Sequence, residues 1–149
     1  GQVVVAGQTA ALEWLAANGK SLGARMVMKL PVSVPSHCSL MKDAAEKLAV
    51  RLAQAQIHKP VIPVLHNLDA EARTDADAIR QALKEQLYRP VRWTRTIQNL
   101  QSQGISQFFE CGPGKVLCGL GKRISAEAKS GALEDAAGLA AAVETVKAG

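Results

Sequence analysis

The chain has 149 residues, 48% of them hydrophobic, and a formal net charge of +5. This length suits one ordinary domain or a part of a larger one. Apolar runs of only a few residues argue against a membrane span, and we expect no secretory leader.

The basic residues are dispersed and aromatic residues are scarce, so nucleic-acid binding is disfavoured. A dispersed positive charge suits an anionic substrate or an acidic partner, or equally a solvated surface. Three cysteines without a C-x-x-C pair argue against a disulfide scaffold and favour reduced thiols in a cytoplasmic protein.

The first thirty residues have the pattern of two strands joined by a helix. Gln2–Ala6 and Arg25–Val32 are apolar and predict strands, and a helix capped by Thr9 and ended by Gly19 lies between them. Two strands are too few for a stable sheet. The chain also opens at Gly1 directly into a strand pattern, so we expect partner strands in a longer protein.

Helical periodicity dominates from Ser39 onward. Apolar residues recur there every four positions, which predicts an amphipathic helix. Val61–Leu65 predicts a short buried strand. Thr74 followed by Asp77 is a capping-box signature, and the helix that it opens must end or kink before Pro90.

The remaining segments continue the alternation of helices with short apolar strands, which predicts an α/β sheet. In order, they are a helix over Trp93–Leu100 that stops at Gly104, a strand over Ser106–Glu110, a turn over Gly112–Gly114, a helix over Lys115–Ile124, and an Ala-rich tail that is helical in part from Leu133 to Val146.

His37 lies where a strand pattern ends and a helix pattern begins. Pro31 and Pro35 stiffen the approach to it. Histidine exchanges a proton readily near neutral pH, so a histidine held at such a junction is a candidate general base. The alternative is a structural histidine stacked on the start of the helix. Cys38 is a further candidate nucleophile, but neighbouring side chains rarely reach the geometry that activates one.

The turn Gly112–Lys115 invites comparison with phosphate-binding loops. It does not fit Walker A, because Phe109 stands where glycine is required and Val116 follows the lysine. A strand–turn–helix junction can still offer backbone N–H groups to an anion. The alternative is a tight turn that places Leu117 and Leu120 in the core.

No metal site is expected, because His58 and His66 lack neighbours at ligand spacing.

Four segments in order resemble one enzyme family. They are Gly1–Gly7 (GQVVVAG), Pro31–Cys38 (PVSVPSHC), Gln86–Trp93 (QLYRPVRW) and Glu110–Leu117 (ECGPGKVL). Together they resemble the C-terminal half of malonyl-CoA:acyl carrier protein transacylases. The family's Gly-His-Ser-x-Gly nucleophile motif is nowhere in the chain.

The resemblance implies an α/β fold. Residues 1–33 would form half of a small ferredoxin-like subdomain. Residues 34–149 would form the C-terminal part of an acyltransferase domain that resembles the α/β-hydrolases.

The resemblance also implies an acyl-serine mechanism in which this chain supplies the base. His37 would take the proton of a serine in the missing half, and the backbone carbonyl of Gln86 would orient its ring. Ser36 would line the acyl pocket and would not be the nucleophile. Gln2 and Arg25 would line the CoA side of the cleft.

The implied partners are malonyl-CoA, acyl carrier protein and the N-terminal half of the same enzyme. No metal or redox cofactor, nucleic acid or membrane is implied. Two alternatives stay open. One is an acyltransferase fragment of a polyketide synthase, and the other is a non-catalytic α/β module that binds CoA or carrier without turnover.

Overall fold

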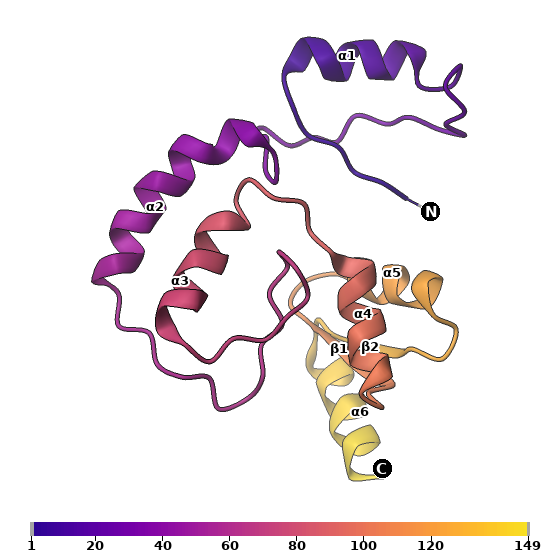
Figure 1. Cartoon of the computed structure of the whole chain (residues 1–149). Coiled ribbons are helices and arrows are strands. Elements are labelled where there is room, and N and C mark those ends of the chain that lie inside the picture. The colour runs from indigo at the N-terminus through magenta and orange to yellow at the C-terminus, as the bar shows by residue number, and fades with distance from the viewer. Residues whose placement is uncertain (1, 149) are drawn as a thin grey trace. The chain divides into compact units, whose positions relative to one another are not determined.

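A computed structural model describes residues Gln2–Ala148 (Figure 1). The chain packs as two compact units, one up to Val91 and one from Arg92 onward. This division reflects packing within the chain. The subdomain boundary expected between residues 33 and 34 concerns a longer enzyme and stays a prediction.

The N-terminal unit contains four helical elements. They are α1 (Thr9–Asn18), the 3-10 helix η1 (Ser39–Met41), α2 (Lys42–Gln54) and α3 (Ala76–Glu85). All three α-helices were expected from the sequence. The predicted cap of α1 was wrong, because Thr9 is already its first residue and Gln8 holds the extended cap conformation.

Gly19 ends α1, as predicted, and the reason is steric. Its N–H donates to Leu15 O at 2.8 Å. A Cβ atom at this position would lie 2.5 Å from Cγ2 of Val27. Only glycine therefore lets the segment after α1 approach the helix end so closely.

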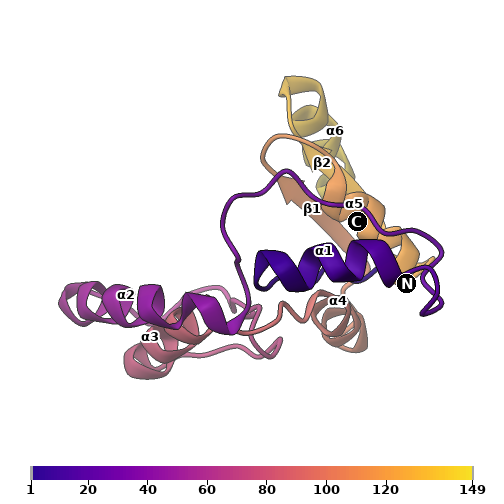
Figure 2. The same cartoon turned by 90° about the horizontal axis from the view of Figure 1, so that it is seen from above.

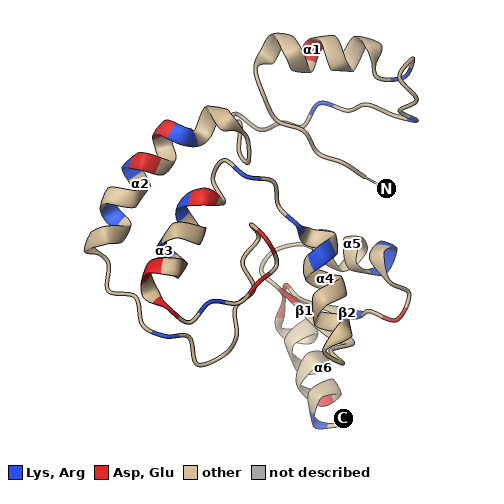
Figure 3. Ribbon diagram, viewed as in Figure 1, with Lys and Arg blue, Asp and Glu red and all other residues tan. Residues whose placement is uncertain are grey.

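Helices α2 and α3 lie side by side and form most of the small core of this unit (Figure 2). Ala45 of α2 and Ile79 and Ala82 of α3 are buried. Small residues at the contact let the two helices pack closely, and both helices also carry charged residues (Figure 3), among them Glu46 of α2 and Lys84 of α3, which form an ion pair between the helices.

Arg80 ties α3 to the end of α2. Its guanidinium donates from Nε to Leu52 O and from Nη2 to Ala55 O, both at 2.9 Å. These carbonyls lie at the C-terminus of α2, where the helix supplies no i+4 N–H, although Leu52 O also accepts from the N–H of the cap residue Ala55 at 3.2 Å. The arginine thus satisfies two backbone groups and complements the negative end of the helix dipole.

Helix α3 begins at a carboxylate cap. The side chain of Asp75 accepts from the N–H groups of Asp77 and Ala78, at 3.0 and 2.9 Å. The predicted capping box beginning at Thr74 was therefore wrong by one residue. The helix ends at Glu85, and a turn follows it up to Pro90, in agreement with the expectation.

The C-terminal unit contains a parallel strand pair with helices around it. Its elements are α4 (Trp93–Ser102), β1 (Gln107–Cys111), α5 (Val116–Ile124), β2 (Lys129–Leu133) and α6 (Ala136–Lys147). Gln107 pairs with Lys129 and Cys111 with Leu133. Helix α5 is the crossover between the strands, which makes a βαβ unit.

Strand β2 was missed by the sequence pattern, and its packing explains why. A Cβ atom on Gly131 would lie 3.2 Å from the ring of Phe109 on β1. The position therefore favours glycine, and the segment Lys-Ser-Gly-Ala-Leu lacks the β-branched residues that mark strands. On the other side of β2, a Cβ atom on Gly138 of α6 would lie 2.3 Å from Ala132 O.

The three strands predicted in the N-terminal unit do not form. Residues 2–6, 25–32 and 61–65 are irregular, apart from one isolated bridge between Leu65 and Ala72. Their apolar side chains face solvent, with Val3 83% and Val61 98% exposed. A strand needs a neighbouring strand along its length, and the described part of the chain pairs these segments with no strand beyond the single bridge at Leu65.

Within Gln2–Ala148, no helix is long and apolar enough to cross a lipid bilayer.

The exposed valines generate a prediction about the isolated 149-residue chain. We expect it to self-associate and to bind a hydrophobic dye such as ANS, because contiguous apolar surface is rarely tolerated on a monomer. Joint replacement of Val3 and Val5 by lysine should reduce both signals. Light scattering and dye fluorescence measure the effect.

Glu13→Lys on α1 is the matched control, since it raises the net charge by the same two units and removes no valine. A monodisperse wild-type monomer with a sharp thermal transition would contradict the expectation.

Candidate functional site

His37 occupies a turn between Pro35 and η1 with an uncommon backbone conformation. Its φ is 64°, in the left-handed region that few residues other than glycine adopt. Its side chain is exposed. Such conformations cost free energy and persist where surrounding contacts enforce them, often at functional sites.

The contacts that hold His37 come from the turn at the end of α3. Its ring Nδ1 lies 2.7 Å from Gln86 O and 3.2 Å from Arg89 O. Its backbone N–H donates to Leu87 O at 2.9 Å. The structure thus brings His37 and Gln86 together across 49 residues of sequence.

The two carbonyls determine which ring nitrogen carries the proton. A carbonyl oxygen only accepts hydrogen bonds, so Nδ1 must be the donor. In the neutral ring, Nε2 then keeps its lone pair. This arrangement prepares the imidazole to accept a proton at Nε2 without needing a carboxylate partner.

The other predicted site residues lie apart from this cluster of hydrogen bonds or only beside it. Ser36 is exposed next to His37, and its N–H donates to Val34 O at 2.8 Å. Gln2 and Arg25 are exposed in the irregular segments on either side of α1. Nothing in their described surroundings assigns them a ligand.

Cys38 does not have the partner that a nucleophilic thiol needs. Its Sγ donates to Pro35 O at 3.2 Å, within the same turn. A backbone carbonyl cannot take the thiol proton, so this contact gives no support to the alternative of a cysteine nucleophile.

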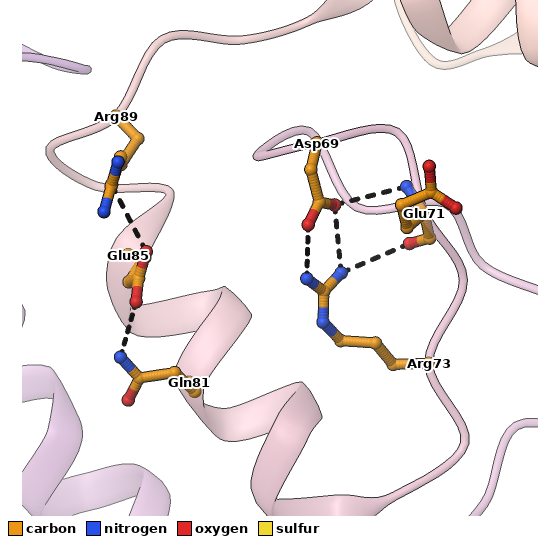
Figure 4. A network of polar contacts seen from close by, with 6 residues as sticks. All are labelled: Asp69, Glu71, Arg73, Gln81, Glu85 and Arg89. Carbon is orange, nitrogen blue, oxygen red and sulfur yellow. Dashed lines mark hydrogen bonds and ion pairs between the residues drawn. The ribbon is translucent and has the colours of Figure 1, made fainter.

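A row of side chains supports the turn that carries the carbonyls (Figure 4). Glu85 accepts from Nε2 of Gln81 at 2.6 Å through one carboxylate oxygen. Its other oxygen lies 3.2 Å from Nε of Arg89. Exposed ion pairs at this i,i+4 spacing are worth only about 0.3–0.5 kcal/mol, so the row orients the turn more than it stabilises the fold.

A second polar cluster shapes the loop before α3 (Figure 4). Both carboxylate oxygens of Asp69 bind the guanidinium of Arg73, at 3.0 and 2.5 Å, and these bonds lower the pKa of Asp69. His66 is buried beneath the loop, and burial together with Arg73 lowers its pKa. These residues brace a tight turn in which Ala70 has a φ of 62°.

The glycine turn Gly112–Lys115 was expected either to offer N–H groups to an anion or to place two leucines in the core. Instead, Glu110 of β1 accepts from the N–H of Cys118 at 2.8 Å. Hydrogen bonds from Cys118, Leu117 and Val116 lower the pKa of Glu110. The chain's own carboxylate thus occupies the N-terminus of α5, which corrects the expectation of an open anion site.

The alternative reading of this turn holds only in part, because Leu117 is exposed and Leu120 is half-buried.

No group of three or more His, Cys, Asp or Glu side chains within Gln2–Ala148 is placed to hold a metal ion. Burial and the neighbouring Glu110 raise the pKa of the Cys118 thiol. This keeps it protonated and a poor nucleophile at neutral pH.

Sequence reasoning missed the carbonyls of Leu87 and Arg89 and the capping role of Glu110. The sequence did hold a clue to the carbonyls of Leu87 and Arg89. Pro90 ends the helix, so carbonyls just before it are left without helical N–H donors. The sequence held no such clue for Glu110, because the backbone N–H that it accepts, that of Cys118, lies beyond a turn whose shape the sequence does not predict.

Comparison with known proteins places this geometry in context. No family model matches the chain. A malonyl CoA-acyl carrier protein transacylase of Escherichia coli is 49% identical over 144 residues, which is 97% of this chain and 47% of that protein. The Bacillus subtilis protein of the same name is 39% identical over 99% of this chain and 46% of its own length.

The chain is homologous to the C-terminal part of malonyl-CoA:acyl carrier protein transacylases. It spans about half the length of the curated relatives that it matches.

Solved structures agree with this assignment. The malonyl-CoA:acyl carrier protein transacylase of Xanthomonas oryzae matches with a TM-score of 0.89 and 47% identity, over 93% of this chain and 44% of that one. A malonyl-transacylase in complex with a type II PKS acyl-carrier protein matches with a TM-score of 0.90 and 46% identity, over 93% and 45% of the two chains. The α/β fold class and the resemblance are thereby confirmed.

The cap at α5 yields a prediction about acid stability in a chimaera that joins the N-terminal half of the E. coli transacylase to this chain. The pKa of Glu110 is lowered by folding. Its stabilising effect is therefore complete above the unfolded-state value of about 4.3 and is lost as pH falls through the folded-state value. Glu110→Gln should lower the free energy of unfolding at neutral pH, and the difference from wild type should shrink in acid.

Urea unfolding as a function of pH measures this difference, with Glu13→Gln on α1 as the control. Equal stability of wild type and Glu110→Gln at neutral pH would refute the cap.

Proposed function

We propose that this chain supplies the general-base half of a malonyl-CoA:acyl carrier protein transacylase. The observation that carries the proposal is the hydrogen bond from Nδ1 of His37 to Gln86 O at 2.7 Å, in a chain homologous to that family. This bond leaves Nε2 as the proton acceptor, which is the atom that acyl transfer through a serine requires.

The reaction would proceed in two balanced steps. Nε2 of His37 accepts the hydroxyl proton of a serine outside this chain while the serine oxygen attacks the thioester carbonyl of malonyl-CoA. The imidazolium then returns the proton to the departing CoA thiolate, and an acyl-serine remains. In the second step the phosphopantetheine thiol of acyl carrier protein gives its proton to Nε2 of His37 and its sulfur attacks the acyl-serine carbonyl. The serine oxygen leaves and takes the proton back from the imidazolium, and the malonyl group remains on the carrier thiol.

The partners of the reaction are malonyl-CoA, acyl carrier protein and the N-terminal half that would hold the serine. One structural neighbour is a malonyl-transacylase bound to a type II PKS acyl-carrier protein. The positive net charge of this chain suits an anionic thioester and an acidic carrier. We place the reaction in the cytoplasm and in fatty acid biosynthesis, with a type II polyketide pathway as the alternative.

The remaining assignments rest on the resemblance. Ser36, beside the base, would border the acyl pocket. Gln2 and Arg25 would face CoA, and arginine suits a phosphate group. Residues 1–33 would complete a small ferredoxin-like subdomain, and residues 34–149 would complete the acyltransferase domain. The irregular segments that carry the exposed valines would then pair with strands from the N-terminal half, which would cover these side chains.

The first test is the base itself. In the chimaera, His37→Ala should slow malonyl transfer by about 10²–10⁴-fold, the range for a lost general base. Folding should survive, because the side chain is exposed and buries little area. Stopped-flow acylation and circular dichroism measure the two effects.

Near-normal turnover by a folded His37→Ala protein would remove His37 from the mechanism. Loss of the fold would favour the structural alternative.

The second test concerns the nucleophile. The 149-residue chain alone should take up no malonyl label from malonyl-CoA, because the nucleophilic serine would lie outside it and the Cys38 thiol donates to a backbone carbonyl that cannot accept its proton. Mass spectrometry after incubation detects an adduct. A stoichiometric acyl group on either residue would overturn the assignment of roles and support a nucleophile within this chain.

A further inference from the structure

The carbonyl of Gln86 is available to His37 because the residue four positions later, Pro90, has no N–H. In an α-helix, the carbonyl of residue i accepts the N–H of residue i+4. For Gln86 that residue is Pro90, which has no N–H. The carbonyl of Gln86 therefore receives no N–H from the i+4 position. Ring Nδ1 of His37 donates to it instead, at 2.7 Å.

The chain stays wound up to the residue before the proline. Glu85 O accepts from the N–H groups of Tyr88 and Arg89, at 3.1 and 3.0 Å. Proline then disfavours helical backbone at Arg89 and stops the winding. The carbonyl of Arg89 is also left available, and it lies 3.2 Å from Nδ1 of His37.

Glu85 holds Arg89 through its side chain as well as its backbone (Figure 4). Its carboxylate lies 3.2 Å from Nε of Arg89 and also accepts from Gln81 at 2.6 Å. The side chain of Glu85 is only 20% exposed, whereas that of Arg89 is 56% exposed. The anchored partner is therefore Glu85, and it fixes where the Arg89 backbone lies.

We propose that Pro90 and Glu85 are positioning residues for His37. Pro90 keeps the carbonyl of Gln86 free of a helical donor, and Glu85 fixes the turn so that the Arg89 carbonyl also faces Nδ1. Together they hold the proton on Nδ1 and the lone pair on Nε2. This inference rests on the proposed role of His37 as the base, and neither residue touches the substrate in it.

The decisive experiment replaces the proline in the chimaera. Pro90→Ala restores an N–H that competes with His37 for Gln86 O. We expect kcat to fall about 5–10-fold, the effect of one net hydrogen bond, with KM for malonyl-CoA unchanged. In ¹⁵N spectra of the neutral imidazole, the population protonated at Nδ1 should fall and that protonated at Nε2 should rise.

Pro63→Ala is the matched control, because Pro63 lies exposed in the irregular segment before the Asp69 loop. It should change neither the rate nor the tautomer. An unchanged tautomer and kcat in a folded Pro90→Ala protein would overturn the role of Pro90.

A second pair of variants covers the case in which Pro90→Ala fails to fold. Glu85→Gln keeps a side chain able to contact Gln81 but loses the charge that binds Arg89, and it should lower kcat and shift the tautomer in the same direction. Glu46→Gln is its control, since it breaks the 2.8 Å ion pair between Glu46 of α2 and Lys84 of α3 without touching the His37 turn. Equal effects of Glu85→Gln and Glu46→Gln would overturn the role of Glu85.

A double-mutant cycle separates this inference from the proposed function. If Pro90 and Glu85 act through His37, their substitutions should have no further effect on residual activity in a His37→Ala background. An additional loss in that background would refute the positioning role. Normal activity of His37→Ala alone would instead refute the proposed function, while the tautomer measurement would still report on the turn.

Discussion

The structure of the candidate site depends on one property of α-helices: their last carbonyl groups cannot all be satisfied by their own backbone. At the end of α3 this need is met by His37, whose ring Nδ1 and backbone N–H bind three carbonyls of the turn. The last carbonyls of the helix and its turn thereby obtain hydrogen-bond donors. The histidine obtains a fixed ring orientation and a fixed tautomer. The same hydrogen bonds thus meet a stability requirement and, under the proposed function, a chemical requirement.

The same logic recurs elsewhere with other partners. Arg80 satisfies the carbonyls at the end of α2, Asp75 satisfies the first N–H groups of α3, and Glu110 satisfies those of α5. At α3 the open helix end binds a side chain of the candidate site, whereas at α5 the cap blocks a possible binding site. The carboxylate fills a site that resembles an anion-binding turn, and so the turn is closed to an outside phosphate.

Burial is uneven along this chain, which spans about half the length of the relatives that it matches. The helices pack against their sequence neighbours and form local cores around Ala45, Ile97 and Ala128. The apolar segments 2–6, 25–32 and 61–65 remain largely exposed. Under the proposed function, acyl transfer would divide between two halves, with the base on this chain and the nucleophile on the other.

The sequence by itself determined the helices and the family resemblance. In the C-terminal unit it also determined β1 and the helix α5 that follows it, but not β2. These depend on hydrophobic period and short motifs, which are local, whereas the exact caps of α1 and α3 lay one residue from the predicted positions. Tertiary structure decided the rest. Residues 2–6, 25–32 and 61–65 have strand composition but form no strands, because pairing requires a neighbour that composition cannot supply. Strand β2 forms despite weak composition because Phe109 packs on Gly131. The joining of His37 to Gln86 likewise needed a fold that brings a turn and a helix end together across 49 residues.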